Sequence, residues 1–278
     1  GTDLGKGAVR WLNLGFITVQ PSEFVKPGFI ILAAWLIGAS FDINGPPGRL
    51  ISFVLAVVIV GLLAMQPDFG QAALILFGWG VVYFVGGAPI FLIAGVIGSG
   101  VVGALFAYKM SQHFARRIDG FITPDLDPRT QLGYAANAIQ EGGFLGVGVG
   151  EGQVKWSLPD AHTDFIIAVA AEEYGLILVT FIVVLYCLIV VRSLFRLLKE
   201  RDPFVRLAGA GLACIFGVQA MINLGVAVRL LPAKGMTLPF ISYGGSSVLA
   251  AGITMGMLLA LTRSRPQGDM GEILRWGR

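Results

Sequence analysis

The sequence predicts an all-α protein, a polytopic bundle of membrane-spanning helices. Of the 278 residues, 55% are hydrophobic and 13% are charged, whereas about 25% of the residues in an average soluble domain are charged. The mean hydropathy is +0.78. The 39 glycines support the same prediction, because small residues let membrane helices pack closely. We expect one membrane domain, residues 1–278.

Seven apolar segments are each close to the ~20 residues that a helix needs to cross a bilayer, so we expect about seven transmembrane helices. The segments are 22–40, 50–66, 70–87, 89–108, 164–191, 206–228 and 245–262. Residues 109–163 are too long for a simple connection. We expect them to form a large extracytoplasmic loop, with a short amphipathic helix near 131–140 at the membrane interface.

Basic residues near the span ends predict the orientation, because cytoplasmic loops are enriched in Lys and Arg. Basic residues cluster in two segments: Arg192, Arg196, Lys199, Arg201 and Arg206 in one loop, and Arg263, Arg265, Arg275 and Arg278 in the C-terminal tail. Seven spans place both segments on one side, which is therefore predicted to be cytoplasmic. The N-terminus, the 66–70 turn and the loops 109–163 and 229–244 then share the other side.

The net charge of +3 and the sequence pI near 9.0 come from a few excess basic residues at these membrane edges. They are topology signals rather than a nucleic-acid surface, so we expect no nucleic-acid partner. Cys187 and Cys214 lie inside predicted spans and indicate no disulfide framework. The chain begins with Gly1 rather than Met, and we expect it to be part of a longer membrane protein.

The run Ala161–Ile167 (AHTDFII) is the most informative part of the sequence. It ends a polar, glycine-rich loop and opens an apolar stretch, which places Asp164 where water gives way to hydrocarbon. A carboxylate there is costly and usually functional, and it suits a general base. The structural alternative is a helix cap formed by Thr163 or Asp164. The neighbouring His162 and two further acids favour function.

Those two acids, Glu172 and Glu173, follow inside the same apolar stretch. We expect both to be structural intramembrane acids that face the bundle interior and find partners there. Lys26, near the start of the first span, is a candidate partner for Asp164. Glu23 lies one turn before Lys26, so a local Glu23–Lys26 pair is the alternative.

Five basic residues on the predicted outer face would attract a phosphate or pyrophosphate group: Arg10, Arg116, Arg117, Arg229 and Lys234. For any single one of them, ordinary surface charge is the better interpretation. The tract Gly146–Gly150 resembles a phosphate-binding loop, but no strand precedes it, which favours a flexible or close-packed loop. His113 and His162 lack a zinc-ligand spacing with cysteine, whereas carboxylates could hold a divalent ion beside a pyrophosphate.

Several motifs, in order along nearly the whole chain, resemble the SEDS family (shape, elongation, division and sporulation). They are RWLNLG from Arg10, QPSE from Gln20 followed by Lys26, QPDFG from Gln66, LPDAHTDF from Leu158, EEYG from Glu172 and LPAKGMTLPFISYGGSS from Leu231. The last motif resembles the division branch, FtsW, more than the elongation branch, RodA. Family members have ten spans, so three would precede Gly1. Asp160 stands where the family usually has Glu.

The resemblance implies a peptidoglycan glycosyltransferase, active on the extracytoplasmic face of the bacterial cytoplasmic membrane. Such an enzyme polymerises lipid II with inversion, and undecaprenyl pyrophosphate is the leaving group. The catalytic aspartate of the family falls on Asp164, the expected general base, and Glu23 and Lys26 line the same cavity. Further residues are expected to bind or support the substrate: Arg10, Trp11, His162, Thr163, Lys234, Ser242 and Ser246.

The resemblance also implies partners: a class B penicillin-binding protein that crosslinks the glycan, and other membrane proteins of the divisome. It establishes no cofactor, and leaves room for Mg²⁺ or Mn²⁺ beside the pyrophosphate. Two other functions remain open, a lipid II flippase and a scaffold for the transpeptidase. A translocation path needs polar groups through the whole membrane depth, whereas the inner halves of these spans look apolar, which favours the polymerase.

Overall fold

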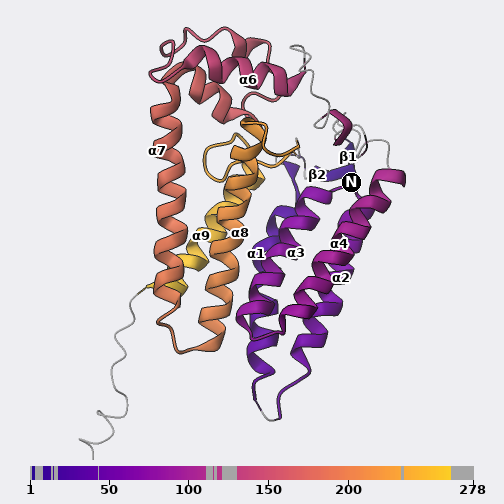
Figure 1. Ribbon diagram of the computed structural model, residues 1–278. Helices are drawn as coiled ribbons and strands as arrows, with labels where there is room; N and C mark the ends of the chain where they lie inside the picture. Colours follow the sequence, from indigo (N-terminus) through magenta and orange to yellow (C-terminus); the bar gives the residue numbers. More distant parts are fainter. Residues whose placement is uncertain are drawn as a thin grey trace, which may run out of the picture.

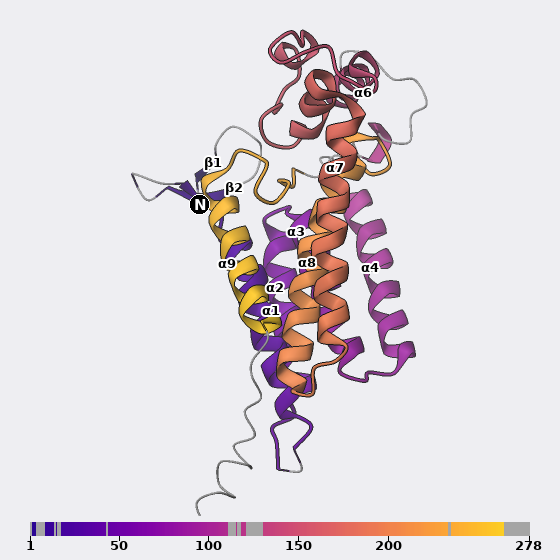
Figure 2. The same cartoon turned by 90° about the vertical axis from the view of Figure 1, so that its left-hand side faces the viewer.

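The computed structural model describes residues 2–3, 9–13, 15, 18–42, 44–110, 115, 118–120, 130–232 and 235–263. In this part of the chain, seven helices run side by side as a bundle (Figures 1 and 2). They are α1 (Pro21–Ala39), α2 (Gly48–Met65), α3 (Phe69–Val85), α4 (Ile90–Met110), α7 (Ile166–Leu197), α8 (Pro203–Ala227) and α9 (Gly245–Thr262). Each falls on one of the predicted apolar segments, and the prediction of a helical membrane bundle is confirmed.

Five of the described helices are long and apolar enough to cross a membrane: α1, α2, α7, α8 and α9. Helix α3 has 17 residues, about 25 Å at ~1.5 Å per residue, slightly less than the ~30 Å of a hydrocarbon core. In α4, the stretch that qualifies as a shorter apolar helix is Gly100–Met110. Helix α4 has 21 residues in all, so α3 is the shortest of these seven helices.

Helix α8 lies at the centre of the bundle and packs against α1, α3, α7 and α9. Glycines at the crossing points make this close packing possible. A Cβ on Gly211 of α8 would lie 2.6 Å from side-chain atoms of both Ile30 in α1 and Val82 in α3. A Cβ on Gly78 of α3 would lie 2.2 Å from Ile215 of α8. These neighbours, with others, form a buried apolar cluster that joins the three helices.

A cap covers one end of the bundle (Figure 1). It consists of α6 (Gln131–Gly142), the glycine-rich loop with the 3-10 helix η1 (Val154–Trp156), and the first part of α7. The amphipathic helix predicted near 131–140 is confirmed as α6. The remainder of the predicted loop 109–163, before Thr130, lies largely outside the described residues.

Helix α7 is broken inside the cap at Gly175, where φ is 77° and ψ is −179°. The predicted span 164–191 is therefore not one straight helix, which corrects the sequence analysis. A Cβ on Gly175 would lie 2.2 Å from the main-chain oxygen of Phe144. Both the left-handed conformation and this close approach require glycine.

Three short strands near the N-terminus form a small antiparallel sheet in the order β1 (Thr2–Asp3), β2 (Val9–Asn13) and β3 (Thr18–Val19). These strands were not predicted, because strands this short carry too little alternation to be recognised. The sheet contacts the bundle through α1 and α9. In Figure 1 the connection between α7 and α8 lies at the end opposite the cap, as the distribution of basic residues predicted.

Gly78 and Gly80 provide a test of the packing of α3 against α8. We expect Gly78→Ala to destabilise the bundle by about 1–3 kcal/mol, because the added methyl group overpacks the contact with Ile215. Gly80→Ala is the control, since a Cβ there meets nothing within 4 Å, and it should change stability by less than about 1 kcal/mol. Thermal unfolding in detergent measures both. Equal effects of the two variants would contradict the packing described here.

Candidate functional site

Asp164 lies two residues before α7, next to a loop that we call the facing loop (residues 235–243). The N-cap of α7 is Phe165, and it makes no side-chain capping hydrogen bond. Phe165, rather than Thr163 or Asp164, thus occupies the N-cap position. The Asp164 side chain is half-buried, and its Oδ2 atom would lie 3.6 Å from a Cβ on Gly235.

Hydrogen bonds hold the segment that contains Asp164 against the facing loop. The Ser242 hydroxyl, which is buried, donates to the main-chain oxygen of Thr163 at 2.6 Å. The Tyr243 amide donates to the main-chain oxygen of His162 at 2.9 Å, while the His162 side chain is exposed. Four residues predicted for the site are thus brought together: His162, Thr163, Asp164 and Ser242.

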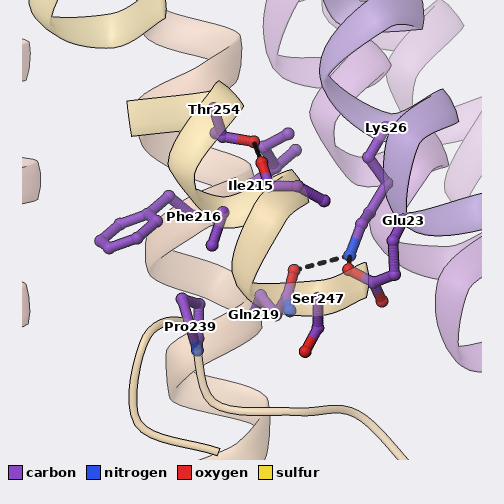
Figure 3. Close-up of a pocket in the computed structure, with 10 residues that line it drawn as sticks. Glu23, Lys26, Ile215, Phe216, Gln219, Pro239, Ser247 and Thr254 are labelled. Carbon is purple, nitrogen blue, oxygen red and sulfur yellow. Dashed lines mark hydrogen bonds and ion pairs between the residues drawn. The ribbon is translucent and has the colours of Figure 1, made fainter. Parts of the chain in front are cut away.

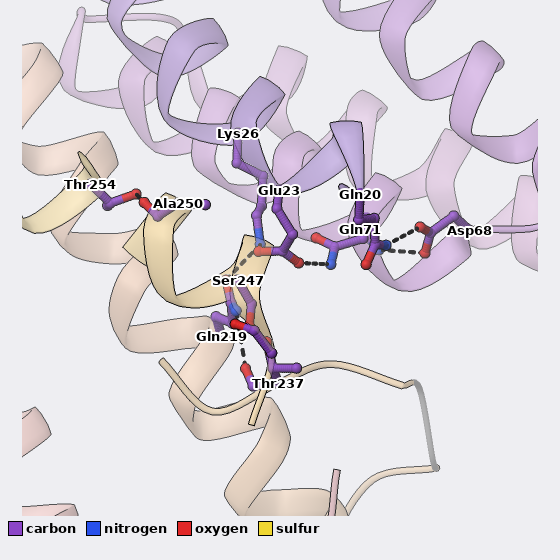
Figure 4. Close-up of polar contacts among 11 residues, drawn as sticks. Gln20, Glu23, Lys26, Asp68, Gln71, Gln219, Thr237, Ser247, Ala250 and Thr254 are labelled. Carbon is purple, nitrogen blue, oxygen red and sulfur yellow. Dashed lines mark hydrogen bonds and ion pairs between the residues drawn. The ribbon is translucent and has the colours of Figure 1, made fainter. Parts of the chain in front are cut away.

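A second polar group lies buried between α1, α3 and α8. Lys26 Nζ donates to Glu23 Oε2 and to Gln219 Oε1, both at 2.7 Å (Figure 3). The side-chain amide of Gln71 donates to the other carboxylate oxygen of Glu23, Oε1 (Figure 4). The ion pair that the structure shows for Lys26 is thus the local one with Glu23. Buried charges need such partners, since desolvation alone makes them costly.

A pocket of about 300 Å³, a volume that includes its open mouth, adjoins this group (Figure 3). Its lining residues come from α1, α8, α9 and the facing loop: Glu23, Lys26, Ile215, Phe216, Gln219, Pro239, Ser247, Ala250, Ala251 and Thr254. Glu23 and Lys26 were expected to share one cavity with Asp164, but Asp164 is not among these lining residues. Gln219 connects the two places, because its amide also donates to the main-chain oxygen of Thr237 in the facing loop at 3.0 Å.

Arg10 ties β2 to the turn between α2 and α3. Its Nε atom donates to the main-chain oxygen of Gln66 at 3.1 Å, and its Nη2 atom donates to that of Pro67. Its Nη1 atom lies 3.6 Å from Asp68 Oδ1. Arg10, predicted to support substrate binding, therefore holds this turn in the structure. Trp11, next to it in β2, is half-buried.

Asp68 is buried at the N-cap of α3, where its carboxylate accepts from the Gln71 amide at 3.5 Å and from Gln20 Nε2 at 3.3 Å. Burial raises the pKa of Asp68 above its ordinary range, and the opposing effect of Arg10 does not cancel this shift. The raised pKa means that folding favours the protonated form. The contribution of Asp68 to stability is thus largest below its ordinary pKa and is lost as the pH rises through the raised value.

Glu172 and Glu173 anchor the glycine-rich loop to the first part of α7. The two carboxylate oxygens of Glu172, which is fully buried, accept from the amides of Val154 at 2.8 Å and Lys155 at 3.0 Å. Glu173 forms an ion pair with the Lys155 side chain. Both acids have partners, as expected, but these lie in the cap before the break at Gly175 rather than deeper along a single straight span.

The remaining predicted residues occupy different positions. Ser246 is buried in the first turn of α9. A Cβ on Gly146 would lie 2.2 Å from the main-chain oxygen of Glu173, so the predicted glycine tract is close-packed at Gly146, whereas a Cβ on Gly150 would meet nothing within 4 Å. Of the residues considered in the sequence, one histidine and three basic residues lie outside the described residues: His113, Arg116, Arg117 and Lys234.

Within the described ranges, no three His, Cys, Asp or Glu side chains form a group that could hold a metal ion.

Sequence reasoning missed three residues of these polar contacts: Gln71, Gln219 and Asn223. The Asn223 amide donates to the main-chain oxygens of Asp164 and Met236. A signal for two of the three was present in the sequence. Gln219 and Asn223 lie one helical turn apart in an otherwise apolar segment, and polar residues in such segments usually face partners.

The FtsW/RodA/SpoVE model of cell cycle proteins matches residues 3–267. The chain belongs to this family. A probable peptidoglycan glycosyltransferase FtsW from Caulobacter vibrioides is 47% identical over 269 residues, which cover 96% of this chain and 69% of the relative. The protein of the same name from Trichlorobacter lovleyi is 37% identical over 271 residues, which cover 92% of this chain and 69% of that relative. The FtsW-like resemblance noted in the motifs is confirmed.

Two solved structures share the fold of this chain. A chain from a structure titled "Structural coordination of polymerization and crosslinking by a peptidoglycan synthase complex" has a TM-score of 0.70 at 30% identity, over 93% of this chain and 74% of that chain. The rod shape determining protein RodA of Thermus thermophilus has a TM-score of 0.64 at 30% identity, over 96% of this chain and 72% of that chain. The bundle is thus the membrane fold of this family.

The buried Glu23–Lys26 pair can be tested with a double-mutant cycle. We expect Lys26→Met to destabilise the protein by about 3–5 kcal/mol, because it leaves the Glu23 carboxylate buried without a counter-charge. Combining it with Glu23→Gln should recover much of that loss, since both buried charges are then gone. Unfolding in detergent provides the free energies. Additive losses in the double variant would show that the two charges are not coupled.

The raised pKa of Asp68 predicts that the stability of the protein depends on pH. As the pH rises from about 4 towards neutral, the wild type should lose stability relative to Asp68→Asn, because burial disfavours the carboxylate and the amide does not titrate. The measurement is the thermal midpoint of both proteins across this pH range. A constant offset between the two curves would mean that burial does not raise the pKa of Asp68.

Proposed function

We propose that this FtsW-like chain is a peptidoglycan glycosyltransferase that polymerises lipid II into glycan strands. The 47% identity with a relative named as a probable peptidoglycan glycosyltransferase carries this proposal. The position of Asp164 supports it. A lipid-linked sugar keeps its chain in the bilayer while its head group reaches the end of the bundle, where a half-buried carboxylate precedes a membrane helix.

Asp164 acts as the general base in this proposal. An acceptor hydroxyl gives its proton to the carboxylate while its oxygen attacks the anomeric carbon of the donor. The bond from that carbon to the pyrophosphate oxygen breaks, and undecaprenyl pyrophosphate leaves. One displacement of this kind inverts the configuration and needs no covalent intermediate. The absence of a side chain on Gly235, beside Asp164 Oδ2, leaves space for the acceptor at the carboxylate.

The pyrophosphate carries the negative charge that develops as it leaves, and positive groups stabilise such charge. Lys26 supplies a buried positive charge at the pocket, and Arg229 and Lys234 are further candidates in the segment after α8. The described residues offer no group of three metal ligands and so do not fit an ion held by protein alone. A Mg²⁺ or Mn²⁺ ion would take most of its ligands from the pyrophosphate, as Mg²⁺ commonly does.

The reaction is assigned to the extracytoplasmic face of the bacterial cytoplasmic membrane. The basic connection between α7 and α8 lies at the end opposite the cap, and basic loops are usually cytoplasmic. The structural neighbour from a peptidoglycan synthase complex, which joins polymerization with crosslinking, supports a class B penicillin-binding protein as partner. Other divisome membrane proteins are further candidate partners.

The test is polymerisation of purified lipid II by the full-length protein with its transpeptidase. Asp164→Asn should reduce glycan formation by about 10²–10⁴-fold, the usual contribution of a general base. Asp202→Asn is the matched control. It makes the same chemical change at the exposed N-cap of α8, where asparagine caps as well as aspartate, and it should retain activity within about twofold.

Equal glycan ladders from Asp164→Asn and wild type would rule out Asp164 as the base. If neither protein polymerises lipid II but both move it across liposomes, the flippase function replaces the polymerase. If neither activity is found and the transpeptidase still binds, the chain acts as a scaffold.

A further inference from the structure

Asn223 connects three separate parts of the chain in the interior of the protein. It lies near the end of α8, and 2% of its surface is exposed. Its Nδ2 atom donates to the main-chain oxygen of Asp164 at 3.0 Å and to that of Met236 at 2.7 Å. One amide group thus joins the backbone of the proposed base to the backbone of the facing loop.

The orientation of this amide is determined by its surroundings. Both N–H bonds of Asn223 are used, one for each carbonyl. The Oδ1 atom is buried and has no hydrogen-bond partner within the described part of the chain. A flipped amide would point this oxygen, which is an acceptor, at two carbonyl oxygens that are also acceptors. Asparagine therefore serves here as a double donor.

Helix α8 gives these contacts a rigid base. It is buried on several sides by α1, α3, α7 and α9. One turn before Asn223, the side chain of Gln219 donates to the main-chain oxygen of Thr237 and accepts from Lys26. Two amides on the same face of one buried helix thus hold consecutive residues of the facing loop, Met236 and Thr237.

We infer that Asn223 is a positioning residue that fixes the backbone of Asp164 relative to the facing loop, with Gln219 holding the next residue of that loop. The inference deepens the proposed function, because it rests on Asp164 as the general base. A base must be held within about 0.5 Å of its productive position, and a displacement of about 1 Å can cost about 100-fold in rate. Asn223 does not touch the reacting atoms in this assignment.

Two substitutions test this role in the full-length protein. Asn223→Asp keeps the size of the side chain but replaces the double donor with an acceptor, and Asn223→Ala removes the group. We expect kcat for lipid II polymerisation to fall by about 10–100-fold, with KM within about threefold of wild type, because the pocket and its charged groups remain. Ser52→Ala is the control, since it removes a buried hydrogen bond to Trp79 between α2 and α3, away from the site.

Amide hydrogen exchange provides a readout that does not depend on activity. In both Asn223 variants, the segments 160–165 and 235–243 should exchange at least about tenfold faster, while α1 to α3 exchange as in wild type. In Ser52→Ala these two segments should be unchanged. If wild type proves to be no polymerase, the proposed function fails, and the exchange result still decides whether Asn223 holds the two segments.

Any of the following results would overturn the inference: unchanged exchange in the two segments, a rise in KM without a fall in kcat, or equal losses of kcat in the Asn223 and Ser52 variants. Faster exchange throughout the bundle would also overturn it, because Asn223 would then support the fold as a whole. Thermal unfolding of each purified variant shows whether the substitution destabilises the whole bundle.

Discussion

The burial of the Lys26 ammonium group among apolar helices is the constraint on which much of this structure depends. An ammonium removed from water needs an opposite charge and acceptors for its protons. Glu23 provides the charge, and Gln219 brings α8 to the same nitrogen. The second oxygen of Glu23 then requires Gln71 of α3 (Figure 4). One buried cation thus determines how three helices face each other.

The same requirement extends to the end of the bundle. Gln219 donates from its side-chain amide to the facing loop, and Asn223 continues the pattern one turn later. The charged cluster and the half-buried Asp164 are therefore different places with different tasks. The cluster orders the helices in the buried interior beside the pocket, where polar groups must be paired. Asp164 lies at the partly exposed edge, where a substrate has access.

Much of the helical arrangement could be predicted from the sequence, because a membrane span is a local property of length and hydropathy. The Glu23–Lys26 pair was also available as the local alternative, since the two residues lie one turn apart. The partners Gln219 and Gln71 were not, because they come from helices far away in the sequence. The break at Gly175 was missed for the same reason, since the segment that approaches Gly175 closely, at Phe144, is far away in the sequence.

The candidate site was predicted in part. The motifs brought Asp164, Thr163, His162 and Ser242 together correctly, and hydrogen bonds between the segments explain why. They did not show that Asp164 is missing from the residues that line the pocket at Lys26. Spacing along the chain places residues on a helix, but the distance between two helices depends on packing. The small residues on α8 that set this packing look alike in the sequence whichever partner they contact.

The break in α7 at Gly175 also determines the length of the straight helix that follows it. As one straight helix, its 32 residues would extend about 48 Å at ~1.5 Å per residue, far beyond the ~30 Å of a hydrocarbon core. The part after Gly175 extends roughly 33 Å, which matches that thickness with little tilt or local deformation of the bilayer. The cap is then held at the level of the lipid head groups. A substrate anchored by its own lipid would meet the protein at a fixed depth.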